Sequence, residues 1–316
     1  MEIRHIPVMS QETLDYLGPV AKDAVFIDCT CGEGGHSEMF LRHYPQLRLI
    51  GLDRDASIQK KAEKRLAVFG DRVTLVNTWF DTFLEEYDDT TFPRPQVILF
   101  DLGISSFHYE ESERGFSFRK DEPLDMRLDT HGNLTAADIV NSYPEERLAD
   151  VIYHYGEERY SRRIASAVCR RRKERRIYSS QDLSGIITSA VPKKYRYGRI
   201  HPATRTFQAL RIEVNGELDR IERSIEHAVQ ILEPGGRLGA ISFHSLEDRI
   251  VKHTFKRLAK RSSYSPERAQ DTDDERLPSI KILTKKPVIP SKEEIQGNAP
   301  SRSAKFRCAE KLHMEQ

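Results

Sequence analysis

Several features that would place a protein in a specialised class are scarce in this sequence of 316 residues. It has only four cysteines, which excludes a disulfide-stabilised secreted domain. Cys29, Cys31 and nearby His36 are too few ligands for a structural zinc site, so we expect no metal. No apolar run approaches the length of a membrane-spanning helix, and the N-terminus lacks the apolar core of a signal peptide. We therefore expect no membrane association and a cytoplasmic location.

Net charge is also small, +1, but the charged residues are unevenly distributed. Two segments, 159–176 and 193–211, are strongly basic and contain interleaved tyrosines. A charged run is most often a solvated helix face. Two such segments in one region favour a polyanionic partner such as RNA. The RNA-binding residues that we predict from them are Arg170, Arg171, Arg172, Lys193, Lys194 and Arg196.

An apolar segment that ends in a glycine-rich turn, residues 25–36, is the most informative feature present. After a helix-length gap, a second apolar segment ends at Asp53. This is the order of a βαβ unit that binds a nucleoside at the carboxyl ends of its strands. Gly34 and Gly35 let the backbone approach a ligand, and Asp53 lies where a carboxylate binds ribose hydroxyls. A glycine turn that only joins a strand to a helix is the simpler alternative, and the position of Asp53 counts against it.

The residues of this predicted site fit S-adenosylmethionine better than a dinucleotide. Ser37 occupies the third glycine position of the dinucleotide pattern G-x-G-x-x-G, and Glu33 would repel a pyrophosphate. S-adenosylmethionine carries no phosphate and has a cationic sulfonium and amine, so it is compatible with the acids Asp28, Asp53 and Asp101. We therefore predict S-adenosylmethionine as the cofactor.

Alternating strand and helix patterns in the first third of the chain predict a mainly parallel sheet. The predicted strands are 24–28, 47–52, 73–76 and 97–100, with a helix at 57–68. The pattern then becomes helical, and strands resume at 234–243 and 281–284. A helix is expected after Pro144 that ends at Gly156, and another is expected between a cap at Ser179 or Ser180 and Pro192. We expect a loose loop at 261–278 and a basic terminal segment at 301–307.

These patterns predict an α/β fold interrupted by an α-helical domain. The predicted boundaries give a discontinuous domain of residues 1–106 plus 216–316 and an inserted, RNA-recognition domain of residues 107–215.

Methylation of an exocyclic base amine requires hydrogen-bond acceptors, because the amine lone pair is delocalised into the ring. Asp101, Ser105 and Ser106 follow the fourth predicted strand and suit this role. Candidates for stacking an extruded base are Phe107, Tyr109 and Phe116, although Phe116 and Phe118 are equally expected to pack the insertion. His244 follows the fifth predicted strand at the ligand edge and is a further catalytic candidate. A helix capping box is sufficient to explain the adjacent Ser245 and Asp248.

Nine short motifs in order resemble the MraW/RsmH family, and they extend over nearly the whole chain. They are His5-Ile-Pro-Val-Met9, Gly34-Gly-His-Ser37, Leu52-Asp-Arg-Asp55, Asp101-Leu-Gly-Ile-Ser-Ser106, Arg114-Gly-Phe-Ser-Phe118, Leu124-Asp-Met-Arg127, Phe207-Gln-Ala-Leu-Arg-Ile212, Ser242-Phe-His-Ser-Leu-Glu-Asp-Arg249 and Arg302-Ser-Ala-Lys305. Each motif alone is weak, but this many in order is specific.

The resemblance implies a class I, Rossmann-like methyltransferase that modifies cytosine N4 in the decoding (P-site) region of 16S ribosomal RNA in the small subunit. Carried over by position, the cofactor contacts that the family implies are Gly34, Gly35, His36, Asp53, Phe80, Asp101 and His108. Members usually have Pro-Gln where this chain has Phe107-His108, so His108 stands in place of the usual glutamine. The terminal pattern also lacks one of the usual arginines.

Two alternatives to this function remain open at the level of sequence. A DNA amino-methyltransferase is disfavoured because Asp101-Leu-Gly-Ile104 does not match the Asp-Pro-Pro-Tyr pattern of that class. A non-catalytic ribosome-assembly factor is disfavoured because the residues of a complete donor pocket are present. The patterns leave open whether the protein forms a homodimer.

Overall fold

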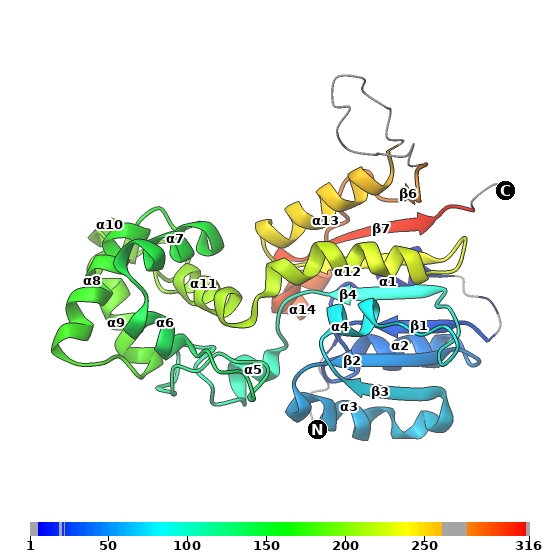
Figure 1. The fold of residues 1–316 in the computed structure, drawn as a ribbon, viewed down its shortest axis with the longest axis horizontal. Coiled ribbons are helices and arrows are strands. Elements are labelled where there is room, and N and C mark those ends of the chain that lie inside the picture. The colour runs from blue at the N-terminus through cyan, green and yellow to red at the C-terminus, as the bar shows by residue number, and fades with distance from the viewer. Residues whose placement is uncertain (1–5, 19–20, 22, 261–276, 314–316) are drawn as a thin grey trace. The chain divides into compact units, whose positions relative to one another are not determined.

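The computed structural model describes residues 6–18, 21, 23–260 and 277–313. The chain forms two compact units, one of Met1–Gly103 with Leu218–Gln316 and one of Ile104–Glu217 (Figure 1). These boundaries lie within three residues of the boundaries expected from the sequence.

A seven-stranded sheet in the order β3-β2-β1-β4-β5-β7-β6 forms the centre of the first unit. The strands β1 to β5 are parallel, and β7 is antiparallel to both β5 and β6. Their bounds are β1 Val25–Asp28, β2 Arg48–Asp53, β3 Val73–Asn77, β4 Val97–Asp101, β5 Arg237–Ser242, β6 Ile280–Ile282 and β7 Lys305–Lys311. The expected α/β fold class, a mainly parallel sheet interrupted by a helical insertion, is confirmed.

Apolar side chains alternate between the two faces of this sheet, as the pleat of a β-strand requires. Phe26 and Leu49 pack with one set of helices, whereas Ile27 and Ile50 pack with another. The first set is α1 (Ser10–Leu17), α2 (Gly35–His43) and α3 (Ala56–Leu66), and the second is α4 (Phe80–Glu85), α12 (Glu217–Ile231) and α13 (Ser245–Leu258). The first unit is therefore a three-layer sandwich in which the carboxyl ends of β1, β2, β4 and β5 share one edge.

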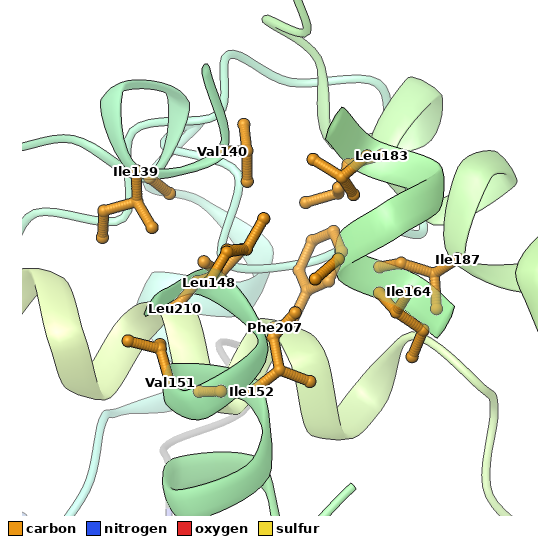
Figure 2. Close-up of a cluster of buried hydrophobic side chains, with 14 of the residues drawn as sticks. Ile139, Val140, Leu148, Val151, Ile152, Ile164, Leu183, Ile187, Phe207 and Leu210 are labelled. Carbon is orange, nitrogen blue, oxygen red and sulfur yellow. The ribbon is translucent and has the colours of Figure 1, made fainter. Parts of the chain in front are cut away.

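Helices form the second unit, and they pack around a separate apolar core (Figure 2). Leu148 and Ile152 of one helix lie close to Phe207 and Leu210 of another in this core. The helices are α5 (Ser106–Glu110), α6 (Ala136–Ser142), α7 (Glu145–Gly156), α8 (Ser161–Glu174), α9 (Ser180–Ala190), α10 (Lys193–Arg196) and α11 (Thr204–Asn215). In α8, Ile164, Ala165 and Val168 are buried on one face, so that most of the arginines lie on the others.

The basic terminal segment expected at 301–307 contains secondary structure that the sequence did not indicate. It includes the end of a short 3-10 helix, Ala299–Ser303, and the start of β7. Lys305 and Arg307 obscure this strand in the sequence, yet Asp248 pairs with both cations, and Arg307 is thereby buried. Most of the expected loop at 261–278 lies outside the described residues. The short helix α14 (Lys292–Gly297) precedes β7.

Candidate cofactor site and catalytic residues

The glycine-rich loop joins the end of β1 to the start of α2. Its backbone is held by hydrogen bonds from the Cys31 N–H to the Leu52 carbonyl (2.8 Å) and from the Gly34 N–H to the Cys31 carbonyl (2.8 Å). Gly34 has φ of 80°, which is strained for a residue with a side chain. A Cβ at this position would also lie 3.1 Å from Leu66 Cδ1. The loop geometry therefore requires glycine at position 34.

Asp53 ends β2 and is hydrogen-bonded to this loop. Its Oδ2 accepts from the Gly32 N–H (2.9 Å) and its Oδ1 accepts from the Asp55 N–H (2.8 Å). The side chain is half-buried at the carboxyl end of β2, the position from which a carboxylate binds ribose hydroxyls in such folds. Asp53 thus fixes the glycine loop and presents an acid at the tip of β2.

His36 and Asp101 approach each other at the ends of α2 and β4. His36 Nε2 lies 3.6 Å from Asp101 Oδ2, and the Asp101 N–H donates to the Thr30 hydroxyl (2.7 Å). Both ring nitrogens of His36 and Oδ1 of Asp101 are buried with no hydrogen-bond partner in the described part of the chain. Unpaired buried polar atoms are costly, so their convergence here fits a polar ligand that completes their hydrogen bonds.

Asp28, at the end of β1, adds a third carboxylate to the same edge of the sheet. It is buried and accepts a hydrogen bond from the Ser37 hydroxyl (2.7 Å). Burial raises the pKa of this carboxyl above its ordinary value, while His36 and the Ser37 hydroxyl oppose that shift. The ends of β1, β2 and β4 therefore bring acids together where a cationic ligand is favoured. The sequence did not indicate that Ser37 and Thr30 would support them.

Phe80 lies at the start of α4, directly after β3. Its ring contacts Phe100 edge to face, with ring centroids 5.6 Å apart. The adjacent Trp79 is covered by the guanidinium of Arg220 at 4.2 Å, and Arg220 also pairs with Asp81. An aromatic ring in this position after the third strand is suited to a purine.

The structure corrects the expected helix cap next to His244. His244, not Ser245, is the N-cap residue of α13: its Nδ1 accepts from the Glu247 N–H at 3.4 Å. Glu247 completes the capping box by accepting from the N–H groups of His244 and Phe243. The predicted capping box was wrong because β5 ends at Ser242 and the helix begins one residue earlier than expected. Asp248 is therefore not part of the box and pairs with Lys305 and Arg307 of β7. A catalytic role for His244 stays a prediction.

The candidates after Asp101 belong to the second unit. Ser105 caps α5, where its hydroxyl accepts from the Phe107 N–H (3.2 Å), and Ser106 is the first residue of that helix. His108 is buried, with its ring 5.5 Å from Phe107 and 5.3 Å from Phe116. Of the three aromatic candidates for base stacking, only Tyr109 is exposed. Phe116 therefore packs within the insertion, as the alternative to base stacking predicted, because it belongs to the apolar core of that unit.

The predicted RNA-binding residues fall into two groups. Arg171 pairs with Glu174 and Asp182, and Arg172 donates to the Val140 carbonyl. Arg196 likewise donates to the carbonyls of Val191 and Ser189, so these three guanidinium groups make structural contacts. The other three cations are exposed and form no ion pair with any residue that the structure describes: Arg170, Lys193 and Lys194.

None of the helices within the described ranges is long and apolar enough to cross a membrane. All four cysteines are buried and free, and burial raises the pKa of Cys29 and Cys31 well above the ordinary value. These thiols therefore pack as small apolar groups.

A parallel sheet with a glycine loop after β1, an acid at the tip of β2 and another at the tip of β4 defines an α/β enzyme that binds a nucleoside without a pyrophosphate. These features place the protein in the class of S-adenosylmethionine-dependent methyltransferases. Comparison with known proteins agrees: the chain belongs to the MraW methylase family, whose model matches residues 2–312. The resemblance noted in the sequence is thereby confirmed, and with it the methyltransferase class and its cofactor.

The chain also matches curated relatives over almost its full length. It is 53% identical over 312 residues to a ribosomal RNA small subunit methyltransferase H of Treponema denticola, covering 99% of this chain and 98% of the relative. It is 47% identical over 313 residues to the protein of the same name from Symbiobacterium thermophilum, with coverage of 99% and 98%. The same name applies to a relative from Synechococcus elongatus at 46% identity over 308 residues, with coverage of 98% and 95%.

Proposed function

We propose that this methyltransferase modifies N4 of a cytidine in the decoding region of 16S ribosomal RNA within the small ribosomal subunit. The names of relatives at up to 53% identity support the substrate class. The observation that carries the chemistry is the buried, unpaired Oδ1 of Asp101 at the end of β4. Because the substrate is ribosomal, the proposal places the enzyme in the cytoplasm.

Residues of the first unit are assigned to the cofactor. Gly34 and Gly35 provide the close backbone approach, and Asp53 accepts the ribose hydroxyls. His36 completes its hydrogen bonds with the ligand, and Phe80 lies beside the adenine. When bound, S-adenosylmethionine supplies an electrophilic methyl group. The family resemblance also implies a cofactor contact from His108, a residue of the second unit, and the affinity of H108A for S-adenosylmethionine tests it.

Asp101, Ser105 and Ser106 are assigned to the acceptor amine. A carboxylate that accepts an N4–H bond orients the remaining lone pair of the nitrogen for direct in-line attack. The N4–C bond forms as the carbon–sulfur bond breaks, and one N4 proton is lost to the carboxylate or to water. No covalent enzyme adduct forms in this scheme, since an amine needs no activation of the ring. Trapping of a stable adduct with 5-fluorocytidine RNA would contradict it.

His244 is proposed as a catalytic residue at the same sheet edge, in addition to its structural role as the cap of α13. An H244N variant retains a side chain that caps helices, so it separates the two roles. In this variant, a loss of the turnover number with unchanged thermal stability supports catalysis, whereas an unchanged turnover number leaves His244 only its role as the cap.

RNA binding is assigned to the exposed cations of the insertion. Arg170 lines a groove of about 470 Å³ between α8 and α9, and Lys193 and Lys194 lie on α10. The variant R170E/K193E/K194E leaves the structural contacts of Arg171, Arg172 and Arg196 intact. We expect it to weaken RNA binding and to flatten its salt dependence while cofactor affinity is unchanged. Unchanged RNA affinity would refute this assignment.

The experiment that tests the function is methyl transfer to small subunits, naked 16S RNA and DNA, followed by nucleoside mass spectrometry. N4-methylcytidine on small subunits supports the proposal, and modified DNA supports the alternative of a DNA amino-methyltransferase. Calorimetry with S-adenosylmethionine tests the non-catalytic alternative, because an assembly factor with a vestigial site would not bind it. Light scattering with and without RNA determines whether the enzyme is a homodimer.

A further inference from the structure

The first unit contains a groove that the proposed reaction does not use. It has a volume of about 750 Å³ and lies beside α13 and β6, two neighbouring elements (Figure 1). Phe255, Ile280 and Ile282 contribute apolar lining. A groove of this size lies within the range of organic-ligand sites, roughly 300–1,000 Å³, so a single inorganic ion would not fill it.

Lysines converge on this groove from three parts of the chain. They come from α13, from β6 and from the turn after β6, and they are Lys252, Lys256, Lys281, Lys285 and Lys286. None of the five forms an ion pair with a residue in the described part of the chain, and no carboxylate lies among the described lining residues. Arg307, which also lines the groove, is in contrast neutralised by Asp248 at 2.7 Å.

A structural explanation accounts for two of these five lysines. β6 is the edge strand of the sheet, and an exposed lysine such as Lys281 prevents pairing with another sheet. Lys256 lies in the last turn of α13, where the helix dipole favours a cation. Lys252 lies one turn earlier, where the like charge of Lys256 is unfavourable. Lys285 and Lys286 are adjacent and exposed. Five lysines around one groove, with no carboxylate among the described lining residues, favour an anionic ligand.

We propose that this groove is a second RNA-binding surface, which contacts the phosphodiester backbone of small-subunit ribosomal RNA away from the target cytidine. The inference rests on the proposed function for its RNA partner. Lysine ammonium groups act as compact point charges that bind phosphates without sequence preference. The apolar lining suits ribose and base surfaces between successive phosphates. An acidic protein segment is the competing occupant, and the experiment distinguishes it.

The test compares two triple variants of the full chain for binding to a 16S RNA transcript. K281Q/K285Q/K286Q removes three groove charges. R48Q/K60Q/K64Q removes three exposed charges on β2 and α3, and β2 is separated from β6 by four strands of the sheet. We expect the groove variant to bind about tenfold more weakly at low salt, with a log–log salt slope that is shallower by about 2. The control variant should retain the affinity and slope of the unaltered protein within about twofold.

Acetylation of lysines, with mass spectrometry as the readout, locates the contact directly. The 16S RNA transcript should protect Lys281, Lys285 and Lys286 and leave Lys60 and Lys64 reactive. Equal RNA affinity of the two variants, or protection by a polyglutamate peptide but not by RNA, would overturn the proposal. If the RNA protects these lysines in the unaltered protein, but the protein transfers no methyl group to small subunits, the proposed function fails and the RNA-binding surface stands.

Discussion

Replacement of Asp53 gives the sharpest test of the cofactor site, because this one side chain is assigned both a structural and a binding role. D53A removes the acceptors of the Gly32 and Asp55 N–H groups at 2.9 and 2.8 Å. It also removes the carboxylate proposed to hold the ribose. Hydrogen bonds to a charged group contribute about 1.5–3 kcal/mol each, so loss of the ribose contacts should cost about 3 kcal/mol. The dissociation constant for S-adenosylmethionine should then rise roughly 100-fold.

Asp55 provides the matched control for this experiment. It is buried, two residues away, and its side chain accepts from the Ser57 N–H at 2.9 Å as the N-cap of α3. D55A should therefore lower the free energy of unfolding by about 1 kcal/mol with less than a threefold change in cofactor affinity.

Isothermal titration calorimetry measures the affinities, and urea unfolding measures the stabilities. If D53A does not fold, D53N retains one acceptor oxygen and serves in its place. Cofactor affinity that survives in D53A, or falls equally in D55A, would refute the assignment of the ribose to Asp53.

The remaining predictions concern stability. G115A should destabilise the protein by about 3 kcal/mol in urea unfolding, because Gly115 has φ of 70° and its Cβ would lie 2.3 Å from the Pro123 carbonyl oxygen. G185A, in α9 with no atom within 4 Å of the added Cβ, should instead stabilise it by about 0.5–1 kcal/mol; a loss of stability there would contradict the argument. Burial raises the pKa of Asp248, but Arg307 and Lys305 outweigh that effect and hold it below the ordinary 3.8. The ion pairs therefore stabilise the fold above about pH 3.8 and are lost as pH falls through the lower pKa of the folded state, so the stability difference between the unaltered protein and D248N should shrink on acidification. A difference that stays constant with pH would exclude this linkage.

Local patterns predicted the strands of the parallel sheet. The strand predicted at 73–76 is β3, Val73–Asn77, and the one predicted at 97–100 is β4, Val97–Asp101. Apolar runs and their flanking turns are encoded within a few residues of each other, so a sequence reveals them directly. β7 was missed because its sequence does not show the apolar pattern of a strand. Its charges make it resemble a tail, and only the distant Asp248 neutralises them.

The candidate site shows the same division between local and long-range information. The glycine loop, the acids at the strand ends and the family could be predicted from the sequence, because they depend on residue type and spacing. Only the tertiary structure brought His36 within 3.6 Å of Asp101 and placed His244 as a helix cap. It also separated the arginines that hold carbonyls or carboxylates from the exposed cations available to RNA. A side chain's partners are set by packing between segments far apart in the chain, and no local pattern encodes that packing.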